Sequence, residues 1–159
     1  MIMNIFNQQY EKVKEARGVL FDFFESIPVA DYTKEVVHFG MGSIRNTQAH
    51  IINCYLHWIA NFALQRALPY LQSEKVSSID QMKIEFKNID QYMDEFIKTY
   101  GDDVNSPIIH VLDKKGEVSS TPLILFTHVI THEFHHKGQM VSMGRILGNP
   151  PPDTDLLRV

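Results

Sequence analysis

The alternation of apolar and polar residues along the chain predicts four helices. In each stretch, apolar side chains recur three or four positions apart, and a capping or helix-breaking residue stands at the boundary. The predicted helices run from residue 4 to residue 27, from Ser43 to the segment before Pro69, from Ser78 to Gly101, and from Thr121 to Gly148. The last helix is the longest, at about 26 residues or roughly 39 Å.

The segment between the third and fourth helices predicts a β-hairpin over residues 107–118. Strand-like residues flank Asp113-Lys114-Lys115-Gly116, in which the glycine suits a tight turn. An isolated hairpin is marginally stable, so we expect it to pack on the helices. Because strands and helices do not alternate along the chain, the pattern predicts an all-α fold, a four-helix bundle with one short hairpin between its third and fourth helices.

The fourth predicted helix carries two histidines within an apolar face. At about 100° per residue, His132 and His136 lie one turn apart in this face, whereas His128 and His135 lie at its border. The apolar residues of the face are Leu125, Val129, Met140, Met143 and Leu147. Imidazoles spaced in this way can hold one metal ion, although an ion normally takes three or more protein ligands. A further ligand must therefore come from elsewhere in the chain.

The second predicted helix has an unusually polar face that offers two candidates for this ligand. The face comprises Thr47, His50, Cys54, His57, Asn61 and Leu64. His50 and His57 are separated by about 10.5 Å along the helix axis, so both can hardly ligate one ion. Helix geometry leaves the choice between them open. We interpret Cys54 as a small core residue, because nothing basic near it in sequence suggests an activated thiol.

The histidines also have a purely structural interpretation. A single histidine on an apolar helical face is more often a hydrogen-bonded core residue than a metal ligand. The pair His132 and His136 is harder to explain in this way, because each buried imidazole would need a partner of its own. A metal-free interaction domain with satisfied core histidines remains the alternative.

Composition limits the class of protein. The 159 residues, 44% of them hydrophobic and 21% charged, suit one domain over residues 1–159 that buries its own core. With a net charge of −4, the chain has no general attraction for nucleic acid. It shows no apolar run long enough for a membrane span and no signal-peptide pattern, and its one cysteine suits a reducing compartment. We therefore expect a cytoplasmic protein that binds neither nucleic acid nor a membrane.

Three segments resemble the DinB-like family of helical-bundle proteins, whose relatives include thiol-dependent S-transferases and mycothiol-dependent maleylpyruvate isomerases. Residues 42–50, Gly-Ser-Ile-Arg-Asn-Thr-Gln-Ala-His, are similar to the family's second-helix signature, which ends in a metal histidine. Residues 132–139, His-Glu-Phe-His-His-Lys-Gly-Gln, are similar to its fourth-helix signature, and the tail at 148–156 is also similar. Lys137 stands where family members often have arginine, which keeps the charge.

The resemblance implies that His50, His132 and His136 hold a divalent ion at a site open to one end of the bundle. It thereby selects His50 over His57. Zinc or nickel is the expected ion, and three imidazoles also suit iron, cobalt or copper. We expect a metal-dependent transferase or hydrolase acting on a small molecule, with a low-molecular-weight thiol as one candidate substrate. The residues identify no catalytic side chain: Glu133 lies about 80–100° from the ligands around its helix and is expected to point away.

A non-catalytic metal-binding or stress-response protein is the alternative function. In that case four protein ligands would fill the coordination shell of the ion, and His57, Cys54 or His135 would supply the fourth. An open coordination position in a concave pocket would instead favour the enzyme. The two hypotheses therefore differ in a feature that a structure can address.

The fourth helix also predicts a homodimer. A second apolar stripe, Phe126, Ile130, Phe134 and Val141, lies nearly opposite the histidine face. A helix that is apolar on two sides needs two coverings, and a four-helix bundle supplies one. A second copy of the chain, another helix or the hairpin would cover the other side, and two-fold pairing is the commonest closed assembly.

Overall fold

The computed structural model describes residues 4–112 and 115–158, and within them the chain is mostly helical with one small antiparallel sheet. The all-α expectation with a hairpin is confirmed, whereas the described residues form five α-helices instead of four. The elements are α1 (Ile5–Ser26), α2 (Val29–Thr33), α3 (Ile44–Tyr55), η1 (Leu56–Ala63), η2 (Ser73–Lys75), α4 (Ile79–Tyr100), β1 (Ile108–Leu112), β2 (Gly116–Ser120) and α5 (Pro122–Ile146).

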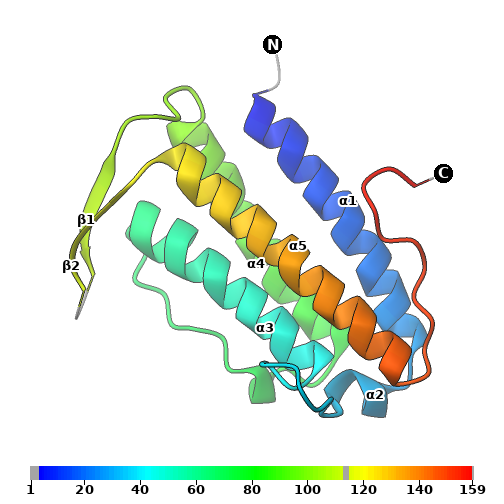
Figure 1. Cartoon of the computed structure of the whole chain (residues 1–159). Coiled ribbons are helices and arrows are strands. Elements are labelled where there is room, and N and C mark those ends of the chain that lie inside the picture. Colours follow the sequence, from blue (N-terminus) through cyan, green and yellow to red (C-terminus); the bar gives the residue numbers. More distant parts are fainter. Residues whose placement is uncertain (1–3, 113–114, 159) are drawn as a thin grey trace.

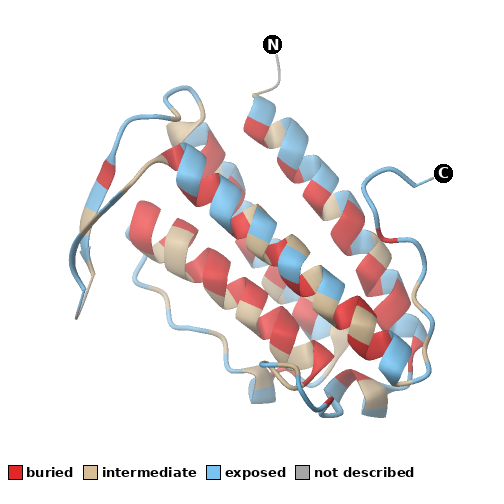
Figure 2. Cartoon of the chain, in the orientation of Figure 1, coloured by how far each residue is buried: buried red, intermediate tan, exposed pale blue. Residues whose placement is uncertain are grey.

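The longer helices pack around a shared core. Helix α5 packs against α3 and α1, and α4 packs against the same two helices, so each of the four has two neighbours (Figure 1). Buried and exposed residues alternate along α1 and α5, as expected for helices with one face in the core (Figure 2). Phe6 of α1 stacks on Phe126 of α5 at 4.1 Å between ring centroids. None of the described helices combines the length and apolar character needed to cross a membrane.

Side-chain caps fix three helix starts at the positions that the sequence predicts. Ser43, Ser78 and Thr121 each accept a hydrogen bond from a backbone N–H three residues further on. The extra helix, α2, follows Pro28 and has only five residues, which is too short for a helical period to show in the sequence.

The second predicted helix differs from its expected form. It is α-helical to Tyr55 and continues as the π-helix η1, which ends at Ala63 and not near Pro69. Residues 64–72, here called the strap, run back along it. Asn61 donates to Leu68 O and accepts from Leu68 N, at 2.9 and 2.6 Å, and Asn53 does the same with Leu71, at 2.9 and 2.7 Å. The polar face of this helix therefore serves partly to hold the strap.

The hairpin pairs β1 with β2 in antiparallel register, from Ile108 opposite Ser120 to Leu112 opposite Gly116. Its second strand is two residues longer than the expected end at residue 118. The predicted turn residues Asp113 and Lys114 lie outside the described residues. Gly116 has a φ of 75°, a conformation that favours glycine. The hairpin packs against η1, where the ring of His110 lies 5.6 Å from that of Phe62.

The second apolar stripe of α5 is covered within the chain. Phe126 is buried against α1, and Ile130 and Phe134 line a small groove with Val13 of α1 and Leu156 of the C-terminal tail. The Lys137 ammonium holds this tail by donating to Thr154 O at 2.5 Å. Within the chain, the coverings are therefore another helix, α1, which was one of the three expected, and the C-terminal tail, which was not expected. The homodimer itself stays a prediction.

A buried ion-pair network joins the four longer helices. Arg17 of α1 is 5% exposed and donates to Glu133 of α5 at 2.7 and 3.0 Å and to Asp90 of α4 at 2.7 Å. The Tyr55 hydroxyl of α3 donates to Glu133 at 2.6 Å, and the Tyr10 hydroxyl donates to Asp90 at 2.7 Å. The carboxylates therefore have partners from several helices, as buried charges require.

Arg17→Met tests the contribution of this network to stability. Removing one partner of a buried ion pair leaves the other charge uncompensated, so we expect the free energy of unfolding to fall by about 3–5 kcal/mol. Urea denaturation measures it. The control is Lys12→Met in the same helix, since Lys12 pairs with Glu15 at the surface and its loss should change stability by under about 0.5 kcal/mol. Equal stability of the two variants would contradict a structural role for Arg17.

Candidate metal centre

Three histidines from two helices converge at the contact between α3 and α5. His50 lies in the middle of α3, and His132 and His136 lie one turn apart on α5. The Nε2 atom of His132 is 3.2 Å from Nε2 of His50 and 3.2 Å from Nε2 of His136. The structure thus brings together the three histidines that the resemblance implies, with their candidate ligand atoms all within 4.8 Å of one another.

The surroundings of His136 select the nitrogen that faces the other histidines. Its Nδ1 lies 2.8 Å from Gln139 Oε1, which can only accept, so Nδ1 carries the proton and Nε2 keeps its lone pair. Gln139 is three residues further along α5, and its Nε2 donates to His135 at 3.2 Å. A metal-binding histidine commonly donates its remote N–H to such an acceptor. Gln139 was part of the sequence signature, but its role was not predicted.

Two of the three nitrogen–nitrogen separations match those around a bound transition-metal ion. Two ligands about 2.0–2.1 Å from a tetrahedral zinc ion are separated by roughly 3.3 Å, close to the two 3.2 Å separations in the structure. His132 Nδ1 is buried without a hydrogen-bond partner among the described residues, so the network within the protein leaves this imidazole incompletely satisfied. The purely structural interpretation of these histidines therefore accounts poorly for His132.

The environment keeps all three imidazoles neutral. Burial, followed by the neighbouring His136 and His50, lowers the pKa of His132 to about 4. Burial also lowers the pKa of His50 and is the main cause that lowers the pKa of His136. A neutral imidazole has the lone pair that ligation requires. The site is therefore prepared for a cation at neutral pH.

A pocket of about 430 Å³ opens beside His50 and His132. Its walls come from α3, η1, the strap and α5. Besides the two histidines, the lining residues are Asn53, Cys54, His57, Trp58, Tyr70 and His128. The volume lies within the range of small-molecule sites, about 300–1,000 Å³. The pocket gives a small molecule access to two of the three histidines.

The other candidate ligands do not join the cluster. Among the described residues, the group that could hold an ion consists of His50, His132 and His136 only. His57 lies with its Nδ1 2.6 Å from the Tyr70 hydroxyl, and His135 is exposed beside Gln139. Cys54 is buried, and burial together with Glu133 raises the pKa of its thiol to about 12. The thiol therefore stays protonated, which agrees with its interpretation as a core residue.

Glu133 and Lys137, which directly follow His132 and His136 in α5, both point away from the site. Glu133 binds Arg17 and Tyr55 in the core, as its position around the helix predicted. Lys137 contacts the tail and lies over the ring of Phe134 at 4.5 Å. The position where this chain has lysine and the DinB-like family often has arginine therefore lies outside the histidine cluster.

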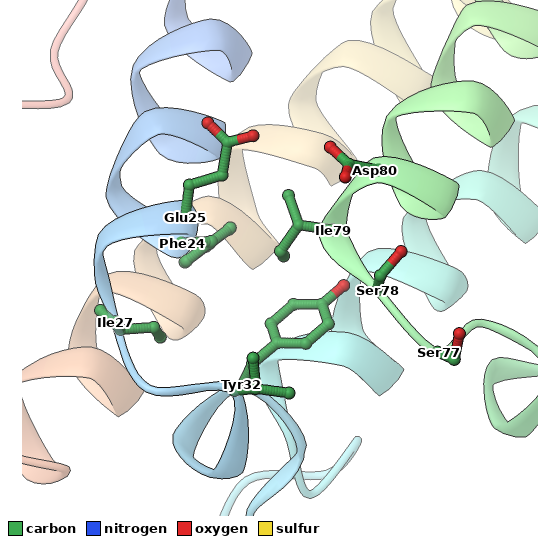
Figure 3. A pocket seen from close by; sticks show the side chains of 9 residues that line it. Phe24, Glu25, Ile27, Tyr32, Ser77, Ser78, Ile79 and Asp80 are labelled. Carbon is green, nitrogen blue, oxygen red and sulfur yellow. The ribbon is translucent and has the colours of Figure 1, made fainter.

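Another cavity, of about 220 Å³, lies at the junction of α1, α2 and α4 (Figure 3). Phe24, Ile27, Tyr32 and Ile79 contribute to its walls, and none of its lining residues is a histidine. The Tyr32 hydroxyl donates to Gln48 at 2.7 Å and is thus already bonded within the protein. This cavity offers no reactive group comparable to the histidine cluster.

Comparison with known proteins agrees with the geometry of the site and with the segments that carry the earlier resemblance. A search of curated proteins found no match. The model of the DinB family matches residues 1–159, which is the whole chain. The protein therefore belongs to the DinB family.

Proposed function

We propose that this protein binds one divalent metal ion through His50, His132 and His136 and acts as a metal-dependent transferase or hydrolase on a small molecule. The convergence of three Nε2 atoms beside an open pocket carries the proposal. Membership of the DinB family and a four-helix bundle built from α1, α3 with η1, α4 and α5 are compatible with it. Zinc or nickel is the proposed ion, and iron, cobalt and copper also suit three imidazoles.

An ion held by three neutral imidazoles keeps its full positive charge and would lower the pKa of a water molecule or thiol that binds it. The residues of the chain orient the metal ligands and position the substrate. Gln139 orients His136, and the pocket walls position a substrate against His50 and His132. A low-molecular-weight thiol is one proposed co-substrate.

The alternative function is a metal site with a purely structural role. A structural zinc site is usually closed by four protein ligands, whereas a catalytic site keeps a position open. In the described residues, His57, Cys54 and His135 do not complete the cluster, and a pocket lies beside it. These observations favour the reactive site over the structural one.

Substituting the ligands tests the metal site directly. We expect His50→Ala, His132→Ala and His136→Ala each to abolish stoichiometric metal binding, because two imidazoles rarely hold an ion. Elemental analysis of protein purified without a histidine tag measures the metal content. His38→Ala and His110→Ala are the matched controls, since these residues lie in the connector before α3 and in β1, outside the cluster. Retention of stoichiometric metal by His50→Ala would overturn the site.

Acid should release the metal, because protons compete for the ligand nitrogens. The pKa of each of the three histidines is lowered, so we expect metal content in equilibrium dialysis to hold near neutral pH and to fall between about pH 6.5 and pH 4. The metal-free protein should also lose stability as the pH falls through this window, because the unfolded chain then binds more protons than the folded one. Metal content that stays flat down to pH 4 would exclude histidine ligation.

A homodimer is the proposed assembly, and the hairpin now supports it. Ile109 and Val111 lie on the same side of β1 and are 49% and 75% exposed, which is unusual for two neighbouring aliphatic residues. Light scattering should give the mass of two chains for the wild type and the mass of one chain for Val111→Asp. A monomeric wild type would refute the dimer. A dimer that survives in Val111→Asp would place the interface elsewhere.

A further inference from the structure

The pocket beside the histidine cluster has a second polar end. His57 and Trp58 from the start of η1 and Tyr70 from the strap line this end. The Tyr70 hydroxyl is 2.6 Å from His57 Nδ1 and so fixes the imidazole ring. The other ring nitrogen, Nε2, has no hydrogen-bond partner among the described residues and is available to a ligand.

The positive charge of Lys115 acts on this end of the pocket. Burial lowers the pKa of His57, and the nearby Lys115 ammonium and His128 lower it further. Lys115 is exposed next to Gly116, the first residue of β2, and the hairpin packs against η1, the helix that carries His57. None of the described residues that line the pocket is an aspartate or a glutamate. This surface therefore favours a ligand that is negatively charged.

Asn53 and Cys54, two other polar residues of the pocket, are not free to bind an anion. Both polar atoms of the Asn53 amide bind the main chain of Leu71, and the pKa of the Cys54 thiol is raised to about 12 by burial and by Glu133. His128 is exposed, and its contacts are with the rings of Trp58 and His132. Because the His128 ring lies against His132, His57 Nε2 is the lining group that can donate to an anion at the end away from the histidine cluster, with the charge of Lys115 nearby.

We propose that His57 and Lys115 form a subsite for the carboxylate of a bifunctional substrate whose other end lies at His50, His132 and His136. The inference rests on the proposed metal-dependent function. Seven residues separate His50 from His57, which corresponds to about 10 Å along the helix. A substrate that reaches both ends therefore needs a chain of several atoms between its two functional groups, and Trp58 provides an apolar wall for that chain.

A series of thiols of increasing length tests the subsite without knowledge of the natural substrate. Cobalt-loaded protein is titrated with mercaptoacetate and 6-mercaptohexanoate, and with the matched alcohols 2-mercaptoethanol and 6-mercaptohexanol, by calorimetry. We expect 6-mercaptohexanoate to bind on the order of tenfold more tightly than 6-mercaptohexanol, the effect of one charge-assisted hydrogen bond. The short pair should show a smaller preference, because mercaptoacetate cannot span the pocket.

Substitutions in the subsite show whether the preference for a carboxylate comes from His57 and Lys115 or from the positive charge of the metal ion. His57→Phe and Lys115→Gln should each reduce the carboxylate preference of the long pair while metal content stays stoichiometric. Lys34→Gln, which removes an exposed lysine next to α2 at the other end of the molecule, should leave it unchanged (Figure 1). A preference that is equal for both lengths, or that survives in both His57→Phe and Lys115→Gln, would overturn the subsite. Absence of bound metal in the wild type would instead overturn the proposed function on which the subsite rests.

Discussion

The buried pairing of Arg17 with Glu133 is the interaction on which the arrangement of the helices depends. The two residues join α1 to α5, and Asp90 and Tyr55 extend the network to α4 and α3. A charge buried to this extent is tolerated only when its partners are correctly placed, so the network penalises other rotations of α5 about its own axis. Glu133 is adjacent to His132, and the rotation that brings Glu133 to Arg17 also turns His132 and His136 toward α3.

Much of the helical framework could be predicted because it rests on local signals. Ser43, Ser78 and Thr121 each mark a helix start by a cap that involves residues close in sequence. The π-helical turn from Leu56 to Ala63 could not be predicted, because the spacing of apolar residues alone does not distinguish it from a continued α-helix. The path of the tail over α5 also escaped prediction, since it depends on a contact between Lys137 and Thr154, 17 residues apart.

Some residues of the candidate site could be predicted from helical spacing, one from the family resemblance, and others not at all. Helical spacing identified His132 and His136, but the choice of His50 over His57 came from the family resemblance, because spacing allowed both. The structure gives the physical difference: His50 faces α5 at the point where α3 and α5 touch, whereas His57 lies beyond the change to π-helix and contacts Tyr70. Gln139 and Tyr70 could not be assigned, since their roles arise only when the rings they contact are in place.

The hydrogen bonds that hold the strap affect how the side chains lining this pocket can change during evolution. Asn53 and Asn61 bind only main-chain atoms of Leu71 and Leu68, so the docking places no demand on the side chains of the strap. Tyr70, which forms part of the pocket wall, stands between these two anchored positions. A substitution at residue 70 therefore alters the lining of the pocket while its backbone remains anchored. A point mutation can in this way change which small molecule fits the pocket, without rebuilding either helix that carries the histidines.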